Sequence, residues 1–133
     1  MGDRYLLDTS ILSQLVREPQ GVIAQRIGRI GEDKVCTSII VAGELRYGAA
    51  RRGSVRLTRQ VEAVLVAMEV LPLEADADRH YAAIRHALER KGASIGANDL
   101  LIAAHARSLG AVCVTGNVSE FKRVPALRVE NWL

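Results

Sequence analysis

Short apolar runs alternate along the chain with longer stretches in which apolar residues recur every three or four positions. A short, continuously apolar run cannot complete a helix and is typical of a strand buried on both faces. Such runs predict strands or extended segments at 5–7, 35–37, 69–72, 111–115 and 127–129. Strands that alternate with helices predict an α/β protein in which helices wrap a parallel sheet.

The intervening stretches predict helices from their 3.6-residue period and from their capping residues. Pro19 is placed to open one helix, and Gly31 and Gly53 are placed to end two others. Residues 99–109 are apolar almost all round, so this helix should be buried, with His105 as a core or interface group rather than a catalyst. The expected helices span 11–16, 19–30, 39–52, 55–68, 77–91 and 99–109.

Length and composition predict a single domain over residues 1–133, because 133 residues with 49% hydrophobic content suffice for one core. No apolar run approaches the ~20 residues that a membrane-spanning helix needs, and residues 1–4 lack the apolar stretch of a secretion signal. We therefore expect a cytoplasmic protein without membrane contact. Cys36 and Cys113 fall inside apolar runs, which favours core packing over a disulfide. A net charge of +3 permits a nucleic-acid partner without requiring one.

Polar residues stand where a parallel sheet binds its ligands, just beyond the carboxyl ends of strands. Asp8 follows the first strand, and the turn 115–117 closes a later one. Glu44 lies on a largely apolar helix face, where a carboxylate is costly unless it is paired or coordinated. Asp99 opens the most apolar helix. Each acid also has a purely structural interpretation, because Asp8 and Asp99 suit helix starts and Glu44 suits an exposed helix face.

Three acids at the approach to one sheet edge repel one another, and none has a Lys or Arg adjacent to it in sequence. Hard divalent cations offset such repulsion, and Mg²⁺ or Mn²⁺ suits a site whose ligands are all oxygens. A metal site made mostly of carboxylates usually acts on a phosphate substrate, whose oxygens complete the coordination of the metal. We therefore hypothesise that Asp8, Glu44 and Asp99 form a catalytic metal site.

Five segments that together reach from end to end of the chain follow the order of motifs in a known family. They read LLDTS at 6–10, SIIVAGELRYGA at 38–49, NDLLIAAHA at 98–106, VTGNVSEF at 114–121 and RVPALRVENW at 123–132. These segments resemble the PIN domain, and in particular the VapC-type toxins of bacterial toxin–antitoxin pairs.

The resemblance implies a PIN-like three-layer fold with a short, mostly parallel central sheet flanked by helices. It implies an endoribonuclease that depends on Mg²⁺ or Mn²⁺ and hydrolyses phosphodiester bonds of tRNA or another structured RNA. Carried over position by position, Asp8, Glu44 and Asp99 are the three metal-binding acids of the family. The resemblance also implies a homodimer held inactive by a VapB-type antitoxin, and apolar surface for these contacts is expected on the helices 11–16 and 55–68.

The chain departs from the family pattern at Ser10, where Asn is commoner, and at Gly116-Asn117, where an Asn-Asn pair is more usual. Many PIN domains carry an acid near this second position, and here the candidates are Asn117 and Glu120. We favour Glu120 as the fourth catalytic acid, because a carboxylate adds charge and can hold a metal-bound water. Ser10, Thr115 and Asn117 are expected to be supporting polar residues.

Basic residues near these motifs are candidates for RNA binding. An ordinary solvated face explains them equally well. With only 4% aromatic residues, the chain cannot stack extensively on bases. The candidates are Arg46, Arg51 and Arg52, which gather with Arg56 and Arg59 around one pair of helices, and Lys122 and Arg123, which flank the last motif.

Two other functions remain open at this point. A phosphoaspartyl-type phosphotransfer domain also places an Asp at the end of its first strand, but the haloacid dehalogenase type needs a second Asp where this chain has Ser10. A non-catalytic RNA-binding regulatory module would keep the fold and lose the reaction. The intact set of Asp8, Glu44 and Asp99 argues against that module.

Overall fold

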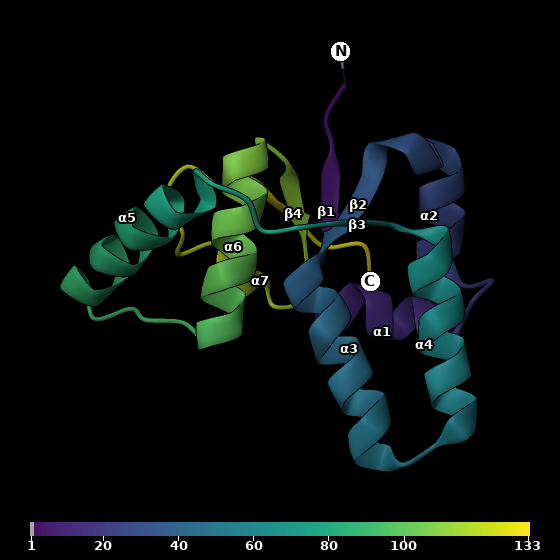
Figure 1. Cartoon of the computed structure of the whole chain (residues 1–133). Helices are drawn as coiled ribbons and strands as arrows, with labels where there is room; N and C mark the ends of the chain where they lie inside the picture. The colour runs from purple at the N-terminus through teal and green to yellow at the C-terminus, as the bar shows by residue number, and fades with distance from the viewer. Residues whose placement is uncertain (1) are drawn as a thin grey trace.

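The computed structural model describes residues 2–133 as a five-stranded parallel sheet with helices packed around it (Figure 1). The strand order is β3-β2-β1-β4-β5, and neighbouring strands run parallel. This architecture confirms the predicted α/β class and its parallel sheet. The strands are β1 (Tyr5–Leu7), β2 (Val35–Ser38), β3 (Glu69–Leu71), β4 (Val112–Val114) and β5 (Val129–Glu130).

The helices form two groups around this sheet. They are α1 (Thr9–Arg17), α2 (Val22–Ile30), α3 (Ile39–Arg52), α4 (Val55–Ala67), α5 (Ala77–Arg90), α6 (Ala97–Leu109) and α7 (Val118–Phe121), with a short 3-10 turn η1 (Glu32–Lys34). Helix α1 packs against α2, α3 and α4, whereas α6 packs against α3 and α5. Figure 1 shows α3 and α4 as a helical hairpin that projects away from the sheet. Within residues 2–133, every helix is too short or too polar to span a lipid bilayer.

The central strand β1 carries the first motif into the middle of the sheet. Leu6 lies between Cys36 of β2 and Cys113 of β4, and all three are fully buried. Burial raises the pKa of Cys36 to about 11, so this thiol stays protonated and packs as an apolar group. Because the strands run parallel, the residues that follow β1, β2 and β4 emerge at the same edge of the sheet.

Several elements begin at positions other than those predicted, among them α6, which begins at Ala97 instead of residue 99. Helix α1 begins at Thr9 instead of residue 11, because both the side chain and the carbonyl of Asp8 accept helical N–H groups. Helix α2 begins at Val22 instead of at Pro19, because residues 19 and 20 form a turn before it. The last strand comes later than expected, at Val129–Glu130.

His105 lies in the buried part of α6 and is confirmed as a core residue. Its side chain is 2% exposed, and its Nδ1 atom lies 2.8 Å from the hydroxyl oxygen of Ser38. Burial lowers the pKa of His105, so the ring is neutral at pH 7. The same Ser38 hydroxyl accepts the N–H of Ile40 (3.1 Å) and caps α3, so this contact ties α6 to the start of α3.

Replacing His105 with Ala should destabilise the fold by about 2–4 kcal/mol, because it leaves a cavity and removes a buried hydrogen bond. Urea or thermal melts measure this loss. His86→Ala on α5 is the matched control, and it should melt like the wild type because His86 is exposed. A His105→Ala protein of wild-type stability would contradict the assignment of His105 to the core.

Candidate active site

Asp8 follows β1 directly and is only 2% exposed. Its carboxylate accepts hydrogen bonds from the Ser10 hydroxyl (2.7 Å), the Ile11 backbone N–H (3.1 Å) and the Thr115 hydroxyl. Burial raises the pKa of Asp8, and these donors oppose the shift because they stabilise the ionised form. The same side chain is therefore both the N-cap of α1 and an acid fixed at the sheet edge.

The two departures from the family pattern contact each other. The Ser10 hydroxyl donates to Asp8 and accepts the backbone N–H of Gly116 (2.9 Å), so it links the ends of β1 and β4. A Cβ atom at position 116 would lie 3.3 Å from the Ser10 hydroxyl oxygen and 3.0 Å from Cδ1 of Leu133. The close approach of these groups favours glycine at position 116.

Glu44 lies in the second turn of α3 and is half-buried. Its Oε1 atom accepts a hydrogen bond from the Thr9 hydroxyl, and its Oε2 atom accepts one from the Asn98 amide (3.0 Å). The sequence pattern did not identify Thr9 or Asn98 as site residues. The available signal was their position, because each adjoins one of the other two predicted acids in the sequence.

Asp99 lies in the first turn of α6 and is half-buried. Burial raises the pKa of Asp99 to about 7, assisted by a hydrogen bond with Glu120 and by the negative charges of Glu120, Glu44 and Asp8. The negative charges of Glu120, Glu44 and Asp8 therefore all act on Asp99, and Glu120 is the one that also forms a hydrogen bond with it.

Of the two candidates for the fourth position, Glu120 of α7 is the one that interacts with Asp99. Asn117 is exposed, and its side chain does not cap α7. Its backbone N–H donates to the hydroxyl of the fully buried Thr115 (2.8 Å), which holds the turn after β4. Glu120 is half-buried and shares a hydrogen bond with Asp99.

The negative charge of this cluster has no cationic side chain to balance it. None of the ion pairs formed within residues 2–133 involves any of the four acids. Within the same residues, no three Asp, Glu, His or Cys side chains are already arranged as ligands of one ion. The donor set is nevertheless the one that fits a hard divalent cation, because it offers carboxylate oxygens whose mutual repulsion a cation would relieve.

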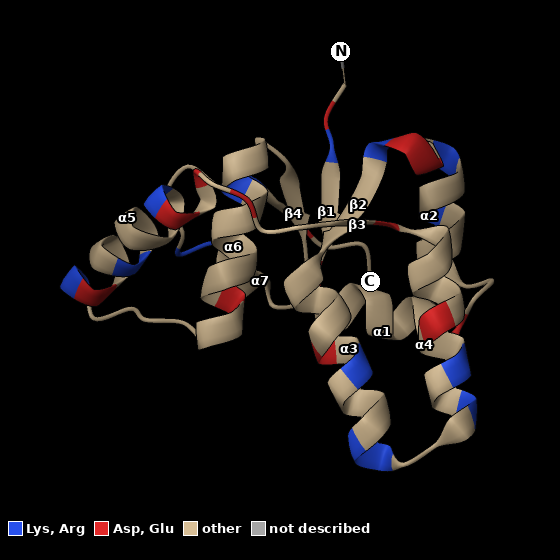
Figure 2. Ribbon diagram, viewed as in Figure 1, with Lys and Arg blue, Asp and Glu red and all other residues tan. Residues whose placement is uncertain are grey.

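The basic candidates do not form one patch. Arg46 pairs with Glu62 of α4 through two hydrogen bonds of 2.8 and 3.0 Å. Arg51 and Arg52 are exposed at the far end of α3, where Figure 2 shows basic residues at the tip of the α3–α4 hairpin. The other two candidates follow α7: Lys122 is exposed, and Arg123 donates to the carbonyl of Ser94 (3.1 Å).

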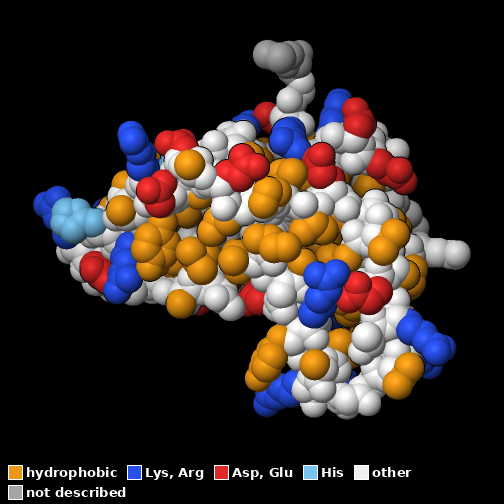
Figure 3. Space-filling view, viewed as in Figure 1, with side chains coloured by type: hydrophobic (Ala, Val, Ile, Leu, Met, Phe, Trp, Pro, Cys, Tyr) orange, Lys and Arg blue, Asp and Glu red, His pale blue; other side chains and the backbone are white. Residues whose placement is uncertain are grey.

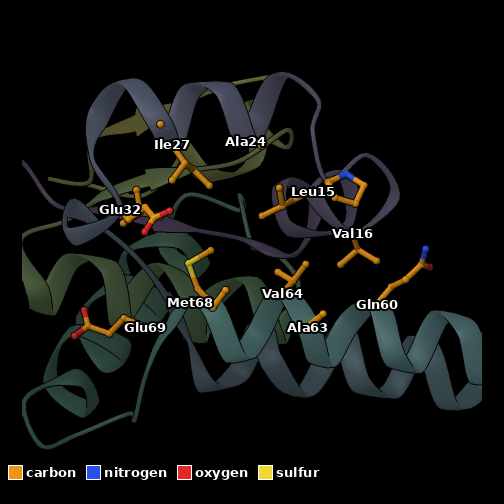
Figure 4. Close-up of a pocket in the computed structure, with 14 residues that line it drawn as sticks. Leu15, Val16, Ala24, Ile27, Glu32, Gln60, Ala63, Val64, Met68 and Glu69 are labelled. Atoms are coloured by element: carbon orange, nitrogen blue, oxygen red, sulfur yellow. The ribbon is translucent and has the colours of Figure 1, made fainter.

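A roomy cavity of about 420 Å³ lies elsewhere, between α1, α2 and α4 (Figure 4). Leu15, Ile27, Val64 and Met68 point into it, and none of the four acids lines it. Glu32, Gln60 and Glu69 also line this cavity, at its rim of otherwise apolar residues. This cavity is therefore separate from the acidic cluster.

Sequence comparisons place these features in one family. A family model described as PIN domain matches residues 5–127. The chain belongs to the PIN-domain family. A PIN-domain relative, Ribonuclease VapC2 of Haemophilus influenzae, is 37% identical over 131 residues, which cover 98% of each protein. The tRNA(fMet)-specific endonuclease VapC of Salmonella typhimurium is 35% identical over 130 residues, covering 97% of this chain and 98% of the relative.

Solved PIN-domain structures match nearly the whole chain. VapBC2 from Rickettsia felis, bound to a DNA fragment from their promoter, matches with a TM-score of 0.89 at 33% identity over 97% of this chain and 98% of that chain. DNA-bound VapBC from Salmonella typhimurium also has a TM-score of 0.89, at 35% identity over 99% of this chain and 100% of that chain. These matches confirm the PIN-like fold that the motifs predicted.

The raised pKa of Asp99 predicts how stability should depend on pH. The folded protein keeps the Asp99 proton up to about pH 7, whereas the unfolded chain releases it near 3.8. Between these values the folded state binds the additional proton, so wild-type stability falls as pH rises. Asp99→Asn abolishes this dependence. In chelator the variant should melt above the wild type at about pH 8, and the gain should shrink toward about pH 4.

Thermal melts over a pH series check this difference, with Asp3→Asn as the control because Asp3 is exposed and far from α6 in the sequence. The control should change little between the two pH values. A loss of stability in Asp99→Asn at high pH would mark Asp99 as a structural partner of the core instead of a member of a repelling cluster.

Proposed function

We propose that this chain is a metal-dependent endoribonuclease, the toxin of a VapBC-type toxin–antitoxin pair, acting as a single cytoplasmic PIN domain over residues 1–133. The observation that carries the proposal is the cluster of four carboxylates without a cationic partner at the carboxyl edge of the sheet. The ribonuclease names of relatives that match along the full chain support an RNA substrate. A tRNA or another structured RNA is the expected target.

Asp8, Glu44 and Asp99 are the residues that would hold Mg²⁺ or Mn²⁺. When bound, such an ion lowers the pKa of a coordinated water and neutralises charge on the scissile phosphate. The protein contributes orientation: Ser10 and Thr115 hold the carboxylate of Asp8 through their hydroxyl groups. Hydrolysis of the phosphodiester bond then leaves a 3′-hydroxyl and a 5′-phosphate.

Further neutral groups hold the other acids. Thr9 and Asn98 each donate to one oxygen of Glu44, and a neutral donor fixes a carboxylate without cancelling its charge. Glu120 shares a hydrogen bond with Asp99, which suits an acid that holds a water of the ion instead of the ion itself.

The phosphoaspartyl alternative has little support in this geometry. A nucleophilic Asp8 of the haloacid dehalogenase type would need a second Asp two residues later in the sequence. The position two residues later holds Ser10, whose hydroxyl supports Asp8 and supplies no second acid.

A VapB-type antitoxin is the expected partner, because the matching solved structures are VapBC complexes. A cluster of carboxylates with no cation attracts a basic side chain, and an inserted Arg or Lys would neutralise it much as a metal ion does. Such an insertion would exclude the ion and the RNA phosphate together. The antitoxin would therefore inhibit by occupying the acids directly.

A homodimer is the second expected assembly. Figure 3 shows apolar side chains gathered across α5, α6 and α3, and on α3 Ile39 is 44% and Tyr47 67% exposed. The prediction of apolar surface on residues 11–16 is wrong, because α1 buries its apolar residues in the core. On α4, Val55 and Val66 are exposed as predicted. A second copy of the chain would cover the face shared by α3 and α6.

Asp8→Asn should abolish cleavage, with a rate at least about a hundredfold below wild type, because an amide cannot supply the charge that a cation needs. The assay incubates protein freed of antitoxin with total RNA and Mg²⁺ or Mn²⁺, and maps the new ends. Asp3→Asn is the matched control, since Asp3 pairs with Arg128 at the surface. Cleavage by Asp8→Asn at the wild-type rate would show that the proposed site is wrong.

Glu120→Gln should raise the Mg²⁺ concentration required for cleavage, or lower the rate, by about ten- to a hundredfold, as losses of groups around a metal usually do. Titration of cleavage against Mg²⁺ measures both effects. Asn117→Ala is the comparison and should stay near the wild-type curve. The reverse result, with Asn117→Ala impaired and Glu120→Gln normal, would give the fourth position to Asn117.

A further inference from the structure

A second cavity, of about 300 Å³, opens beside the acids between α1 and the α3–α4 hairpin. Thr9 and Glu44, which are hydrogen-bonded to each other, both line it. This cavity, called here the α1–α3 groove, therefore begins at the candidate active site. Of the cavities described above, it is the one that shares a residue with the acidic cluster.

Two helical rows run along the groove away from the acids. On α3 the lining residues Glu44, Gly48 and Arg52 recur every four positions, and on α1 Thr9 and Arg17 are likewise eight residues apart. At 1.5 Å per residue, each row extends about 12 Å from its first member. The row on α3 begins at the acid Glu44, the row on α1 begins at Thr9 next to Asp8, and each row ends in an arginine.

These two arginines are free to meet an anion. Arg52 is exposed and forms no ion pair within residues 2–133. Arg17 donates to the amide oxygen of Gln14 (2.8 Å), a neutral partner that leaves its charge uncompensated. Arg46, by contrast, is already paired with Glu62 and does not line the groove.

The middle of the groove has room for a ligand. A Cβ atom added to Gly48 would meet no atom within 4 Å. Leu45 and Leu57 line the same cavity and offer apolar contact. A sugar or the face of a base fits such a wall, while a phosphate oxygen needs the cationic end.

We propose that the α1–α3 groove is the subsite that binds the RNA nucleotides next to the scissile phosphate. Arg17 and Arg52 bind phosphate oxygens, and Gly48 leaves the space that a nucleotide occupies. The assignment rests on the proposed ribonuclease function. The positions of the charges favour RNA over a basic peptide. The four acids repel the phosphates of an RNA strand at one end of the groove, and the two arginines attract them at the other end.

Binding of a short single-stranded oligoribonucleotide, measured by fluorescence anisotropy in chelator at several salt concentrations, tests the subsite without cleavage. Arg17→Ala and Arg52→Ala should each weaken binding about tenfold at low salt and reduce the slope of log K against log salt by about 0.7. Arg90→Ala is the matched control, because Arg90 is exposed at the end of α5, forms no ion pair within residues 2–133 and does not line the groove. The control should bind like the wild type.

Gly48→Leu tests the space independently of charge. It should weaken RNA binding about tenfold with an unchanged salt slope, and should not lower the melting temperature because leucine favours a helix more than glycine does. Gly43→Leu is its control, since Gly43 lies on the same helix, meets no atom within 4 Å and does not line the groove.

Several results would overturn the subsite. One is wild-type RNA binding by the Arg17, Arg52 and Gly48 variants. Another is an equal loss of binding in Arg90→Ala. A third is a Gly48→Leu protein that binds RNA normally but no longer binds antitoxin. Cleavage of total RNA by the wild type is scored separately. A protein that needs the groove to bind RNA but never cleaves keeps the subsite and loses the ribonuclease function, whereas a protein that cleaves equally well in every groove variant loses only the subsite.

Discussion

Repulsion among four carboxylates at one edge of the sheet is the constraint on which the rest of the structure depends. The fold holds these acids with hydroxyl, amide and backbone N–H groups, supplied by residues such as Thr9, Ser10, Asn98 and Thr115. Neutral donors orient a carboxylate while leaving its charge in place. An Arg or Lys among them would stabilise the folded chain more strongly and would also fill the position that an ion has to take. The arrangement therefore lowers the stability of the folded chain and leaves the negative charge of the four acids uncompensated.

Much of this organisation is readable from local pattern, because strands and caps are decided by neighbouring residues. The strand before Asp8 and the buried helix after Asp99 are of this kind, and both acids lie where the pattern placed them. The donors to Glu44, by contrast, cannot be predicted from neighbouring residues. Thr9 and Asn98 are separated from it by 35 and 54 positions, so only the packing of α1 and α6 against α3 brings them to its two oxygens.

Surface charge shows the same limit. Arg46 looks like the other basic residues of the α3–α4 pair in sequence, yet Glu62 on the facing helix compensates it. Arg17 is not among the predicted RNA-binding residues, but the packing of α1 places it on the same cavity as Arg52. Proximity along the chain therefore says little about which cations share a surface. By contrast, the separate family departures at Ser10 and Gly116 prove to be one feature, a single hydrogen bond between two strand ends.

The strand order also has a consequence for how the protein is made. β1 is completed first but occupies the centre of the sheet, and its neighbour β4 lies more than a hundred residues later. The backbone N–H of Asp8 donates to the carbonyl of Val114 (3.0 Å), and Glu120 comes later still. A nascent chain that still lacks β4 already carries three of the acids, but it lacks the Val114 carbonyl and the Thr115 hydroxyl that contact Asp8. The cluster of four acids is therefore completed only after residue 120 has been synthesised, and a shorter nascent chain carries an incomplete set.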